Sequence, residues 1–219
     1  MRGIAVIGGE GPGPGTLREI VQGAELLVAA DSGLASCEEA GLRPDWICGD
    51  MDSLDDPGRL SKYASERVRR YPRDKDFTDT ELALALLREQ GCDEIWIAGG
   101  GGGRVDHLFA IRALFDRDDP PNRWFPGRER GCCADIRCIR GGKSLSAVLL
   151  PGSIVSVFPL GKGPWEAESS GLKWPLGGQG WQAGSFGISN VAAEGGLEIR
   201  SIRGRFMAIM PMLSGKIEL

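Results

Sequence analysis

The chain of 219 residues contains a single histidine, which excludes any site built from two or three imidazole side chains. No stretch approaches the ~20 apolar residues that a membrane-spanning helix needs, and the apolar run within MRGIAVIGGEGPG is too short for a secretory signal. An excess of positive charge is absent as well, because 26 Lys and Arg stand against 30 Asp and Glu. The formal net charge of -4 disfavours binding of nucleic acid or an acidic membrane by general attraction. We therefore expect a cytoplasmic protein without a nucleic-acid or membrane partner.

Several common catalytic and metal-binding motifs are also missing. The sequence has neither G-x-S-x-G nor C-x-x-C, and the spacing of Cys132, Cys133 and Cys138 does not match a structural zinc site. Because disulfides are rare in the cytoplasm, we expect all six cysteines to be free thiols that are buried or half-buried. The segment GGKS at 141–144 resembles the end of a Walker A loop, but Arg137 stands where the first glycine belongs. We therefore do not assign a phosphate site to it.

The first half of the chain alternates short apolar runs with helical patterns. The runs end at Gly or Asp, which is typical of strands in a parallel sheet buried on both faces; they cover residues 4–7, 26–30, 46–48 and 95–98. Residues 80–89 and 105–115 have apolar side chains at helical spacing. In the loop GGEGPGPG at 8–15 the prolines are expected to block the start of a helix. This alternation predicts an open α/β layer.

The second half has a different character. Residues 116–131 are charged, rich in proline and without periodicity, which predicts a linker or an excursion of the chain. From Ala134 onward short β-rich runs alternate with Gly or Pro turns. The expected fold class is therefore α/β plus all-β: an open, mostly parallel α/β sheet domain over residues 1–125, followed by a β-sandwich domain over residues 126–219.

Acidic residues follow two of the predicted strands. Asp31 comes directly after the run at 26–30, and Asp50 and Asp52 come after the run at 46–48. Open α/β sheets bind ligands beyond the carboxyl ends of their strands. Two carboxylates side by side repel each other unless a cation lies between them, and Mg²⁺ prefers such hard oxygen ligands. Solvated acids in an Asx-type turn are the alternative.

A second cluster, KDFTD at 75–79, stands just before the helical pattern at 80–89. Thr78 and Glu81 have the spacing of a capping box, which predicts that the helix begins there. Asp76 and Asp79 could therefore serve only as acids at a helix start. Lys75 is less expected in that role and could hold a phosphate oxygen beside a metal ion.

The third cluster is a run of five glycines followed by RVDH at 104–107. Glycines between a strand and a helix allow backbone N–H groups to approach an anion, and the helix N-terminus favours negative charge. Arg104 adds a guanidinium that fits phosphate. The segment predicts phosphate binding, although the glycines could form a flexible turn and His107 could be an ordinary helix residue.

In chain order, these clusters resemble the thiamine pyrophosphokinase family. The matching segments are ADSG at 30–33, GDMDS at 49–53, KDFTD at 75–79, GGRVDH at 102–107, SGLKWPL at 170–176 and ISN at 188–190. The resemblance implies an ATP-binding catalytic domain, a thiamine-binding and dimerisation domain, and a homodimer with its active sites between subunits. It also implies transfer of pyrophosphate from ATP to thiamine with Mg²⁺, leaving AMP.

Carried over by position, the resemblance implies a role for each matching residue. The catalytic residues would be Asp50, Asp52, Asp76, Asp79, Arg104 and Asp106, of which Asp50, Asp52 and Asp76 would hold Mg²⁺. ATP would contact Asp31, Ser32, Lys75, Gly102, Gly103, Arg104 and His107, and thiamine would contact Asp79, Trp174, Ser189 and Asn190. Some family members carry an aromatic residue after the Ser-Asn pair that stacks on thiamine, whereas residues 191–194 have no ring. Either Trp174 or Trp181 replaces that ring, or the acceptor is not thiamine.

The expected chemistry follows from what phosphoryl transfer requires. Lys75 and Arg104 would neutralise charge on the phosphates, and Asp79 or Asp106 would orient or deprotonate the acceptor hydroxyl. Positioning should contribute more to the rate than proton abstraction, because a carboxylate is a weak base for an alcohol. Two alternatives remain open: a pyrophosphokinase for another hydroxymethyl heterocycle such as a pterin, and a non-catalytic nucleotide sensor.

Overall fold

The computed structural model describes residues 1–51, 57–129 and 132–212. The chain forms two compact units. The first contains Met1–Ile111 and Trp124–Arg128, and the second contains Arg112–Arg123 and the described residues from Glu129 onward. Within the described ranges, no helix is long and apolar enough to cross a membrane.

The first unit is built around a mainly parallel sheet with the strand order β6-β5-β1-β2-β3-β4. The strands are β1 (Arg2–Val6), β2 (Leu26–Ala30), β3 (Trp46–Gly49), β4 (Val68–Arg70), β5 (Glu94–Ala98) and β6 (Arg123–Phe125). β1 pairs in parallel with β2 and β5, and places Ile4 opposite both Leu27 and Trp96. β3 pairs in parallel with β2, and β4 with β3. The predicted open parallel layer is therefore confirmed.

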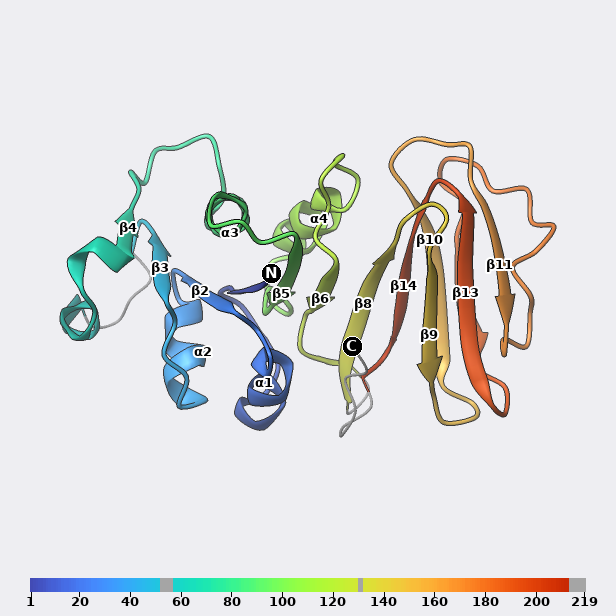
Figure 1. Ribbon diagram of the computed structural model, residues 1–219, viewed down its shortest axis with the longest axis horizontal. Coiled ribbons are helices and arrows are strands. Elements are labelled where there is room, and N and C mark those ends of the chain that lie inside the picture. Colours follow the sequence, from blue (N-terminus) through green and yellow to red (C-terminus); the bar gives the residue numbers. More distant parts are fainter. Residues whose placement is uncertain (52–56, 130–131, 213–219) are drawn as a thin grey trace. The chain divides into compact units, whose positions relative to one another are not determined.

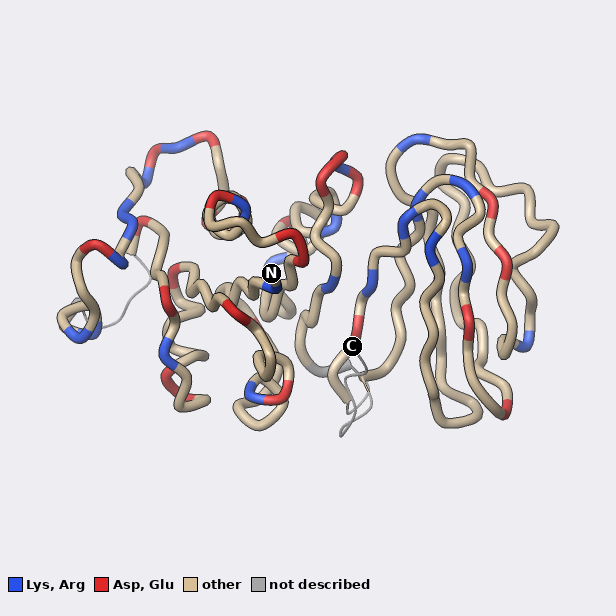
Figure 2. The backbone as a smooth tube through the Cα atoms, viewed as in Figure 1, with Lys and Arg blue, Asp and Glu red and all other residues tan. Residues whose placement is uncertain are grey.

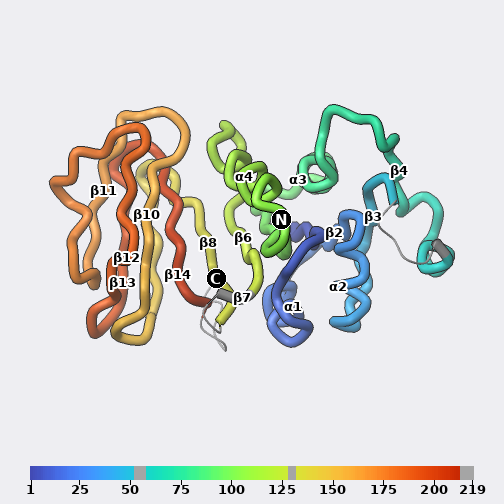
Figure 3. Tube along the Cα trace, turned by 180° about the vertical axis from the view of Figure 1, so that it is seen from behind, coloured from blue at the N-terminus to red at the C-terminus, as the bar shows by residue number. Residues whose placement is uncertain are grey.

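Helices cover both faces of this sheet. They are α1 (Pro14–Val21), α2 (Gly33–Glu39), α3 (Asp79–Glu89) and α4 (Val105–Leu114), with 3₁₀ turns at Pro57–Lys62 and Ser65–Arg67. In Figures 1 and 3, α1 and α2 lie on one side of the sheet, and α3 and α4 lie on the other. β1, β2 and β5 are buried at every residue after the first, as expected for strands covered on both faces.

The ends of the helices follow local sequence rules, with one correction. α3 begins with the predicted capping box, in which Thr78 Oγ1 accepts from the Glu81 N–H and the Glu81 side chain accepts from the Thr78 N–H. The expectation that prolines in residues 8–15 block a helix start was wrong. α1 begins at Pro14 itself. At the first position of a helix the N–H has no intrahelical partner in any case, so the missing proton of proline costs nothing there.

The second unit is the predicted β-sandwich. One sheet has the order β12-β10-β14-β8 and the other β11-β13-β9. The strands are β8 (Cys132–Ile139), β9 (Ser144–Val148), β10 (Ile154–Leu160), β11 (Glu166–Ser170), β12 (Gly187–Val191), β13 (Gly196–Arg203) and β14 (Arg205–Pro211). Val155 and Phe206 from the first sheet pack with Leu145 and Ile199 from the second in a shared core. Alternation of buried and exposed residues along β13 is the pattern expected for a sheet with one buried face.

The described part of the segment at 116–131, residues 116–129, is more ordered than a linker. It contains β6 and the short strand β7 (Arg128–Glu129). Arg205 donates to the backbone carbonyls of Asp116, Arg117 and Asp118, and the Gly161 N–H donates to Asp116 Oδ1 at 2.7 Å. The segment has the composition of a linker, but hydrogen bonds from residues 45–89 positions away in the chain hold it in place. No local sequence pattern reveals such distant partners.

A buried ion-pair triad lies in the second unit. Asp135, whose side chain is 3% exposed, accepts two hydrogen bonds from Arg123 at 2.8 and 2.6 Å, and a third from Arg137 at 3.0 Å. Burial by itself raises the pKa of Asp135, but the hydrogen bonds from Arg123 and the charge of Arg137 bring that pKa below its ordinary value. The carboxylate is therefore charged and fully paired within the protein.

Candidate active site

Three carboxylates from distant parts of the chain meet in the first unit. Asp31 follows β2, Asp50 follows β3, and Asp79 is the first residue of α3. Each offers an oxygen, and these oxygens lie within 4.8 Å of one another. β2 and β3 are parallel neighbours, so their carboxyl ends meet at one edge of the sheet, and α3 packs against both strands. The structure therefore brings Asp31, Asp50 and Asp79 together at this edge.

The backbone around the cluster is unusual. Gly49 has a φ of 136°, and a Cβ added there would lie 3.2 Å from Asp79 Oδ1 and 3.3 Å from the Asp31 Cβ. The glycine therefore allows Asp31 and Asp79 to approach each other. In the described chain, only three non-glycine residues have positive φ: Asp31 at 50°, Met51 at 64° and Ser189 at 58°. Backbone strain of this kind concentrates at functional sites, and two of the three residues belong to or adjoin the acidic cluster.

Lys75 supplies the positive charge of the cluster. Its Nζ lies 3.1 Å from Asp79 Oδ1 and 3.5 Å from Asp50 Oδ2, and its side chain is only 13% exposed. Burial lowers the pKa of Lys75, but the hydrogen bond and charge of Asp79 together with the charge of Asp50 outweigh this effect and raise it above the ordinary value. Figure 2 shows acidic and basic residues alternating along the loop between β4 and α3, the segment that contains Lys75.

The chemistry of the donors fits a hard divalent cation. Three carboxylates of partial burial, all oxygen donors, are the ligand type that Mg²⁺ prefers. The expected metal ligands were Asp50, Asp52 and Asp76. Asp50 is in the cluster, Asp52 lies outside the described residues, and Asp76 is exposed on the loop before α3. Asp79 was expected among the acidic catalytic residues and Asp31 as a contact of ATP, and the structure places both beside Asp50.

The glycine run lies after β5 at the same edge of the sheet. Its first three amides donate to the backbone: Gly99 to Phe125, Gly100 to Gly8 and Gly101 to Glu10. Gly102 and Gly103, with φ of 65° and 56°, remain the part of the run predicted to meet an anion. β1 lies between β5 and β2, so the end of β5 is two strand spacings, roughly 10 Å, from that of β2.

Arg104, just before α4, and Asp106, in its first turn, form an exposed ion pair. The guanidinium donates to both carboxylate oxygens of Asp106, at 3.1 and 2.5 Å, and its hydrogen bond lowers the pKa of Asp106 to about 2. These contacts use two of the five N–H donors of Arg104, so the others can meet a phosphate. His107 is exposed next to this pair, and Ser32 precedes α2 at the carboxyl end of β2.

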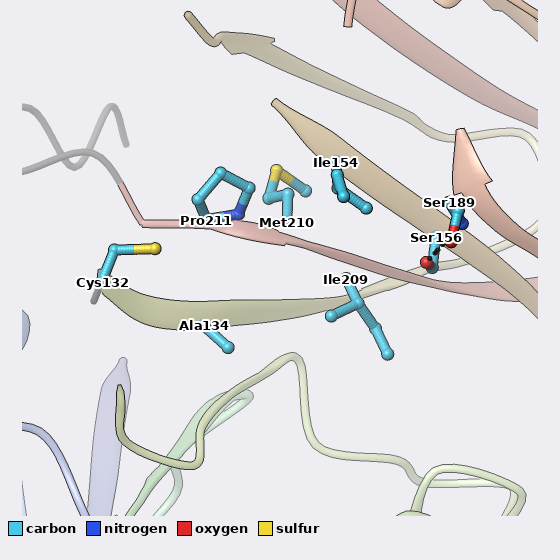
Figure 4. A pocket seen from close by; sticks show the side chains of 8 residues that line it. All are labelled: Cys132, Ala134, Ile154, Ser156, Ser189, Ile209, Met210 and Pro211. Atoms are coloured by element: carbon cyan, nitrogen blue, oxygen red, sulfur yellow. Dashed lines mark hydrogen bonds between the residues drawn. The ribbon is translucent and has the colours of Figure 1, made fainter. Parts of the chain in front are cut away.

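The second unit has a pocket of about 310 Å³ on its four-stranded sheet. Figure 4 shows the residues that line it: Cys132, Ala134, Ile154, Ser156, Ser189, Ile209, Met210 and Pro211. Among the described residues, the lining has two hydroxyls and a thiol but no charged side chain. Ser189, predicted from the sequence to contact thiamine, is the third residue with positive φ. Ser156 is a further lining residue, and no sequence motif indicated it.

Asn190 and Trp174, which were also predicted to contact thiamine, lie in the second unit outside this lining. Asn190 is buried, and its side-chain amide accepts from the Trp174 N–H at 3.1 Å and donates to the Trp174 carbonyl at 2.6 Å. Trp174 is exposed, with the Lys173 ammonium 4.6 Å from its ring. Trp181 packs edge-on against Phe206 in the sandwich core, at 5.2 Å between ring centroids. Of the two tryptophans considered for stacking, Trp174 is therefore the accessible one.

Comparisons with known proteins agree with both units. Residues 17–119 match the model of the thiamin pyrophosphokinase catalytic domain, and residues 144–204 match that of the thiamin pyrophosphokinase vitamin B1 binding domain. The thiamine pyrophosphokinase of Bacillus subtilis is 35% identical over 92 residues, which span 41% of this chain and 43% of that relative.

Solved structures show the same fold along almost the whole chain. The thiamine pyrophosphokinase of Bacillus subtilis aligns with a TM-score of 0.79 and 23% identity, over 97% of this chain and 100% of that one. The thiamin pyrophosphokinase of Geobacillus thermodenitrificans aligns with a TM-score of 0.71 and 26% identity, over 98% and 99%. The enzyme of Candida albicans aligns with a TM-score of 0.70 and 18% identity, over 96% and 89%. With both domain models matched in order along the sequence, the chain belongs to the thiamin pyrophosphokinase family.

Proposed function

We propose that this protein transfers the pyrophosphoryl group of ATP to the hydroxyl of thiamine, producing thiamine diphosphate and AMP. The observation that carries the proposal is the convergence of Asp31, Asp50 and Asp79 with Lys75 at the carboxyl edge of a parallel sheet. Ligands of open α/β sheets bind at this edge. Thiamine is proposed as the acceptor because one of the two matched domain models of the family is named for binding vitamin B1.

Attack on the β-phosphorus of ATP requires neutralised phosphates and an acceptor hydroxyl held in line. We assign Asp31, Asp50 and Asp79 to holding Mg²⁺, which supplies charge neutralisation on the phosphate oxygens when bound. Lys75, now held by Asp50 and Asp79, lies close enough to turn its ammonium to a phosphate oxygen near them. We keep, as part of this proposal, the roles expected from the sequence for three further acids. Asp52 and Asp76 would be metal ligands, and Asp106 would act on the acceptor hydroxyl.

The acceptor is assigned to the second unit. The described lining of its pocket has apolar walls and hydroxyl groups without charged side chains, which suits the neutral aminopyrimidine ring of thiamine. Ser189 would donate or accept a hydrogen bond there, and the exposed ring of Trp174 is available for stacking. Asn190, which holds the backbone of Trp174, would act on thiamine through that loop.

The proposal is tested by measuring AMP release with Mg·ATP and a panel of acceptors: thiamine, a hydroxymethyl pterin and water. We expect release that depends on thiamine, with thiamine diphosphate as the second product. Asp50→Asn should lower kcat at least 10²-fold while the circular dichroism spectrum is unchanged, because it removes charge from the site. Glu39→Gln, on the exposed end of α2, is the matched control and should leave kcat unchanged.

Other outcomes would change the assignment. Release of AMP with the pterin but not with thiamine would make the protein a pyrophosphokinase for another heterocycle. Binding of Mg·ATP without AMP release for any acceptor would make it a nucleotide sensor. Near-normal turnover in Asp50→Asn would refute the role of the acidic cluster.

We also propose that the protein is a cytoplasmic homodimer with its active sites between subunits. Six free cysteines suit a reducing compartment. Large apolar side chains are exposed on and beside β12, at Phe186, Ile188 and Ile154, and such a group on one sheet suits an interface with a second copy. Sedimentation velocity of the wild type should give twice the mass of one chain, and a monomer that is fully active would refute the dimer.

A further inference from the structure

Ser189 has a backbone conformation that its position in a strand does not explain. It lies in β12, an edge strand paired with β10, yet its φ is 58°. The pairing of these strands is irregular, because Val155 is opposite Asn190 whereas Val157 is opposite Gly187. A serine in the left-handed region is strained, since the Cβ approaches the backbone, and such a conformation persists only when its surroundings maintain it.

The hydroxyl of Ser156 contacts the backbone of Ser189 at this irregular pairing. Ser156 lies in β10 between the two pairs where the register shifts, and is opposite Ile209 of β14. Its Oγ accepts a hydrogen bond from the Ser189 N–H at 3.2 Å, as the dashed line in Figure 4 marks. A side-chain oxygen therefore takes the place that a strand carbonyl occupies in a regular ladder.

The same contact determines where the Ser189 side chain lies. Both serines line the pocket of about 310 Å³, whose other described lining residues are apolar or sulfur-bearing. In such surroundings a hydroxyl at the correct position decides how a heteroaromatic ring is oriented. If the Ser189 backbone relaxed to an extended conformation, its Cβ would point to a different side of the strand.

We propose that Ser156 is a positioning residue of the acceptor site, which holds Ser189 in the left-handed conformation that directs its hydroxyl into the pocket. This inference rests on the proposed function, because thiamine is the acceptor whose binding it concerns. In this proposal, Ser156 influences the binding of thiamine indirectly, by holding Ser189.

The test compares Ser156→Thr with Ser156→Val. Both side chains have the same shape and favour strands, but only Thr keeps the Oγ acceptor. We expect the KM for thiamine of the Val variant to exceed that of the Thr variant about 3- to 10-fold, the effect of one lost hydrogen bond. The KM for ATP should be equal in the two variants, and kcat should agree within about twofold. Ser146→Ala, on an exposed position of β9, is the control and should match the wild type.

A double-mutant cycle shows whether the effect passes through Ser189. Ser189→Gly removes the hydroxyl but tolerates the positive φ without strain. In that background, replacing Thr by Val at position 156 should change the KM for thiamine by less than twofold, because the group that was positioned is gone. Equal factors in both backgrounds would show that Ser156 contacts thiamine directly and would overturn the inference.

Isothermal titration of thiamine into the protein without ATP gives a second readout of the same pair. A Kd ratio equal to the KM ratio supports positioning in the ground state. Equal Kd and KM values for Thr and Val would refute the inference and leave the proposed function intact. The absence of thiamine-dependent AMP release by the wild type would instead refute the proposed function, so the two failures are distinguishable.

Discussion

Replacing Lys75 by methionine should strengthen the binding of a divalent cation to the acidic cluster. The Lys75 ammonium lies 3.1 Å from Asp79 and 3.5 Å from Asp50, so a cation that binds these carboxylates must displace it. Two positive charges a few ångströms apart in a partly buried site repel by several kcal/mol. Release of the lysine from the carboxylates is therefore the less costly route.

The cost of that release sets the magnitude. Exposed ion pairs contribute about 0–1 kcal/mol, and breaking a buried pair costs about 3–5 kcal/mol. With its side chain 13% exposed and two carboxylate partners, Lys75 falls between these limits. A cost of about 1–2 kcal/mol corresponds to roughly 5- to 30-fold tighter metal binding in Lys75→Met, since each 1.36 kcal/mol is a factor of ten.

The assay is titration of Mn²⁺ into the protein without nucleotide, followed by electron paramagnetic resonance of the free ion. Lys62→Met is the matched control, because Lys62 is an exposed lysine 3.8 Å from Glu38 and outside the cluster. Turnover should move in the opposite direction, since Lys75→Met also removes a positive charge from the phosphates. Unchanged or weaker Mn²⁺ binding in Lys75→Met would refute the competition between lysine and metal.

Three further predictions concern the stability and reactivity of the chain. Asp135→Asn should lower the free energy of unfolding by about 3–5 kcal/mol in urea titrations, because it leaves buried guanidinium groups poorly paired. The control Glu166→Gln breaks an exposed pair of 3.8 Å with Arg203 and should change that free energy by less than about 0.5 kcal/mol. Equal effects of the two substitutions would contradict this account. Because the pKa of Asp135 is lowered in the folded protein, its contribution is complete above the unfolded pKa of about 3.9 and is lost as the pH falls through the folded value. Wild type should therefore lose more stability below about pH 4 than Asp135→Asn does. Burial raises the pKa of both Cys37 and Cys48 to about 12, so neither thiol should react at pH 8. Mass spectrometry after treatment of the folded protein with a thiol reagent should find both unmodified. Rapid labelling of either would show that its burial is transient.

The strands and helices that local patterns predicted correctly have a simple physical basis. β2 was predicted at its observed bounds because an apolar run ending at Asp can be buried from both faces. α3 was predicted because Thr78 and Glu81 satisfy the backbone at its start within three residues. In each case the interactions that determine the element lie within the element.

The elements that were missed depend on distant partners. β4 has three residues, and β12 contains Ser and Asn at positions that a strand does not favour. β6 lay in a segment predicted as a linker, although Phe125 accepts a hydrogen bond from the Gly99 N–H at 2.9 Å. Their strand conformation is imposed by the neighbouring strand, so no window of local sequence contains the cause.

For the site, the sequence by itself determined which residue types stand at the carboxyl ends of strands, and this is sufficient to predict an acidic, phosphate-handling edge. Only the tertiary structure decided which carboxylates meet, because the approach of Asp31 to Asp79 depends on the packing of α3 over β2 and β3 and on the space left at Gly49. The tertiary structure also paired Lys75 with Asp50, and it placed the Ser156 hydroxyl within hydrogen-bond distance of the strained backbone of Ser189. Local spacing fixes the direction in which a side chain leaves the backbone, whereas distances between side chains from separate strands are set by how those strands pack.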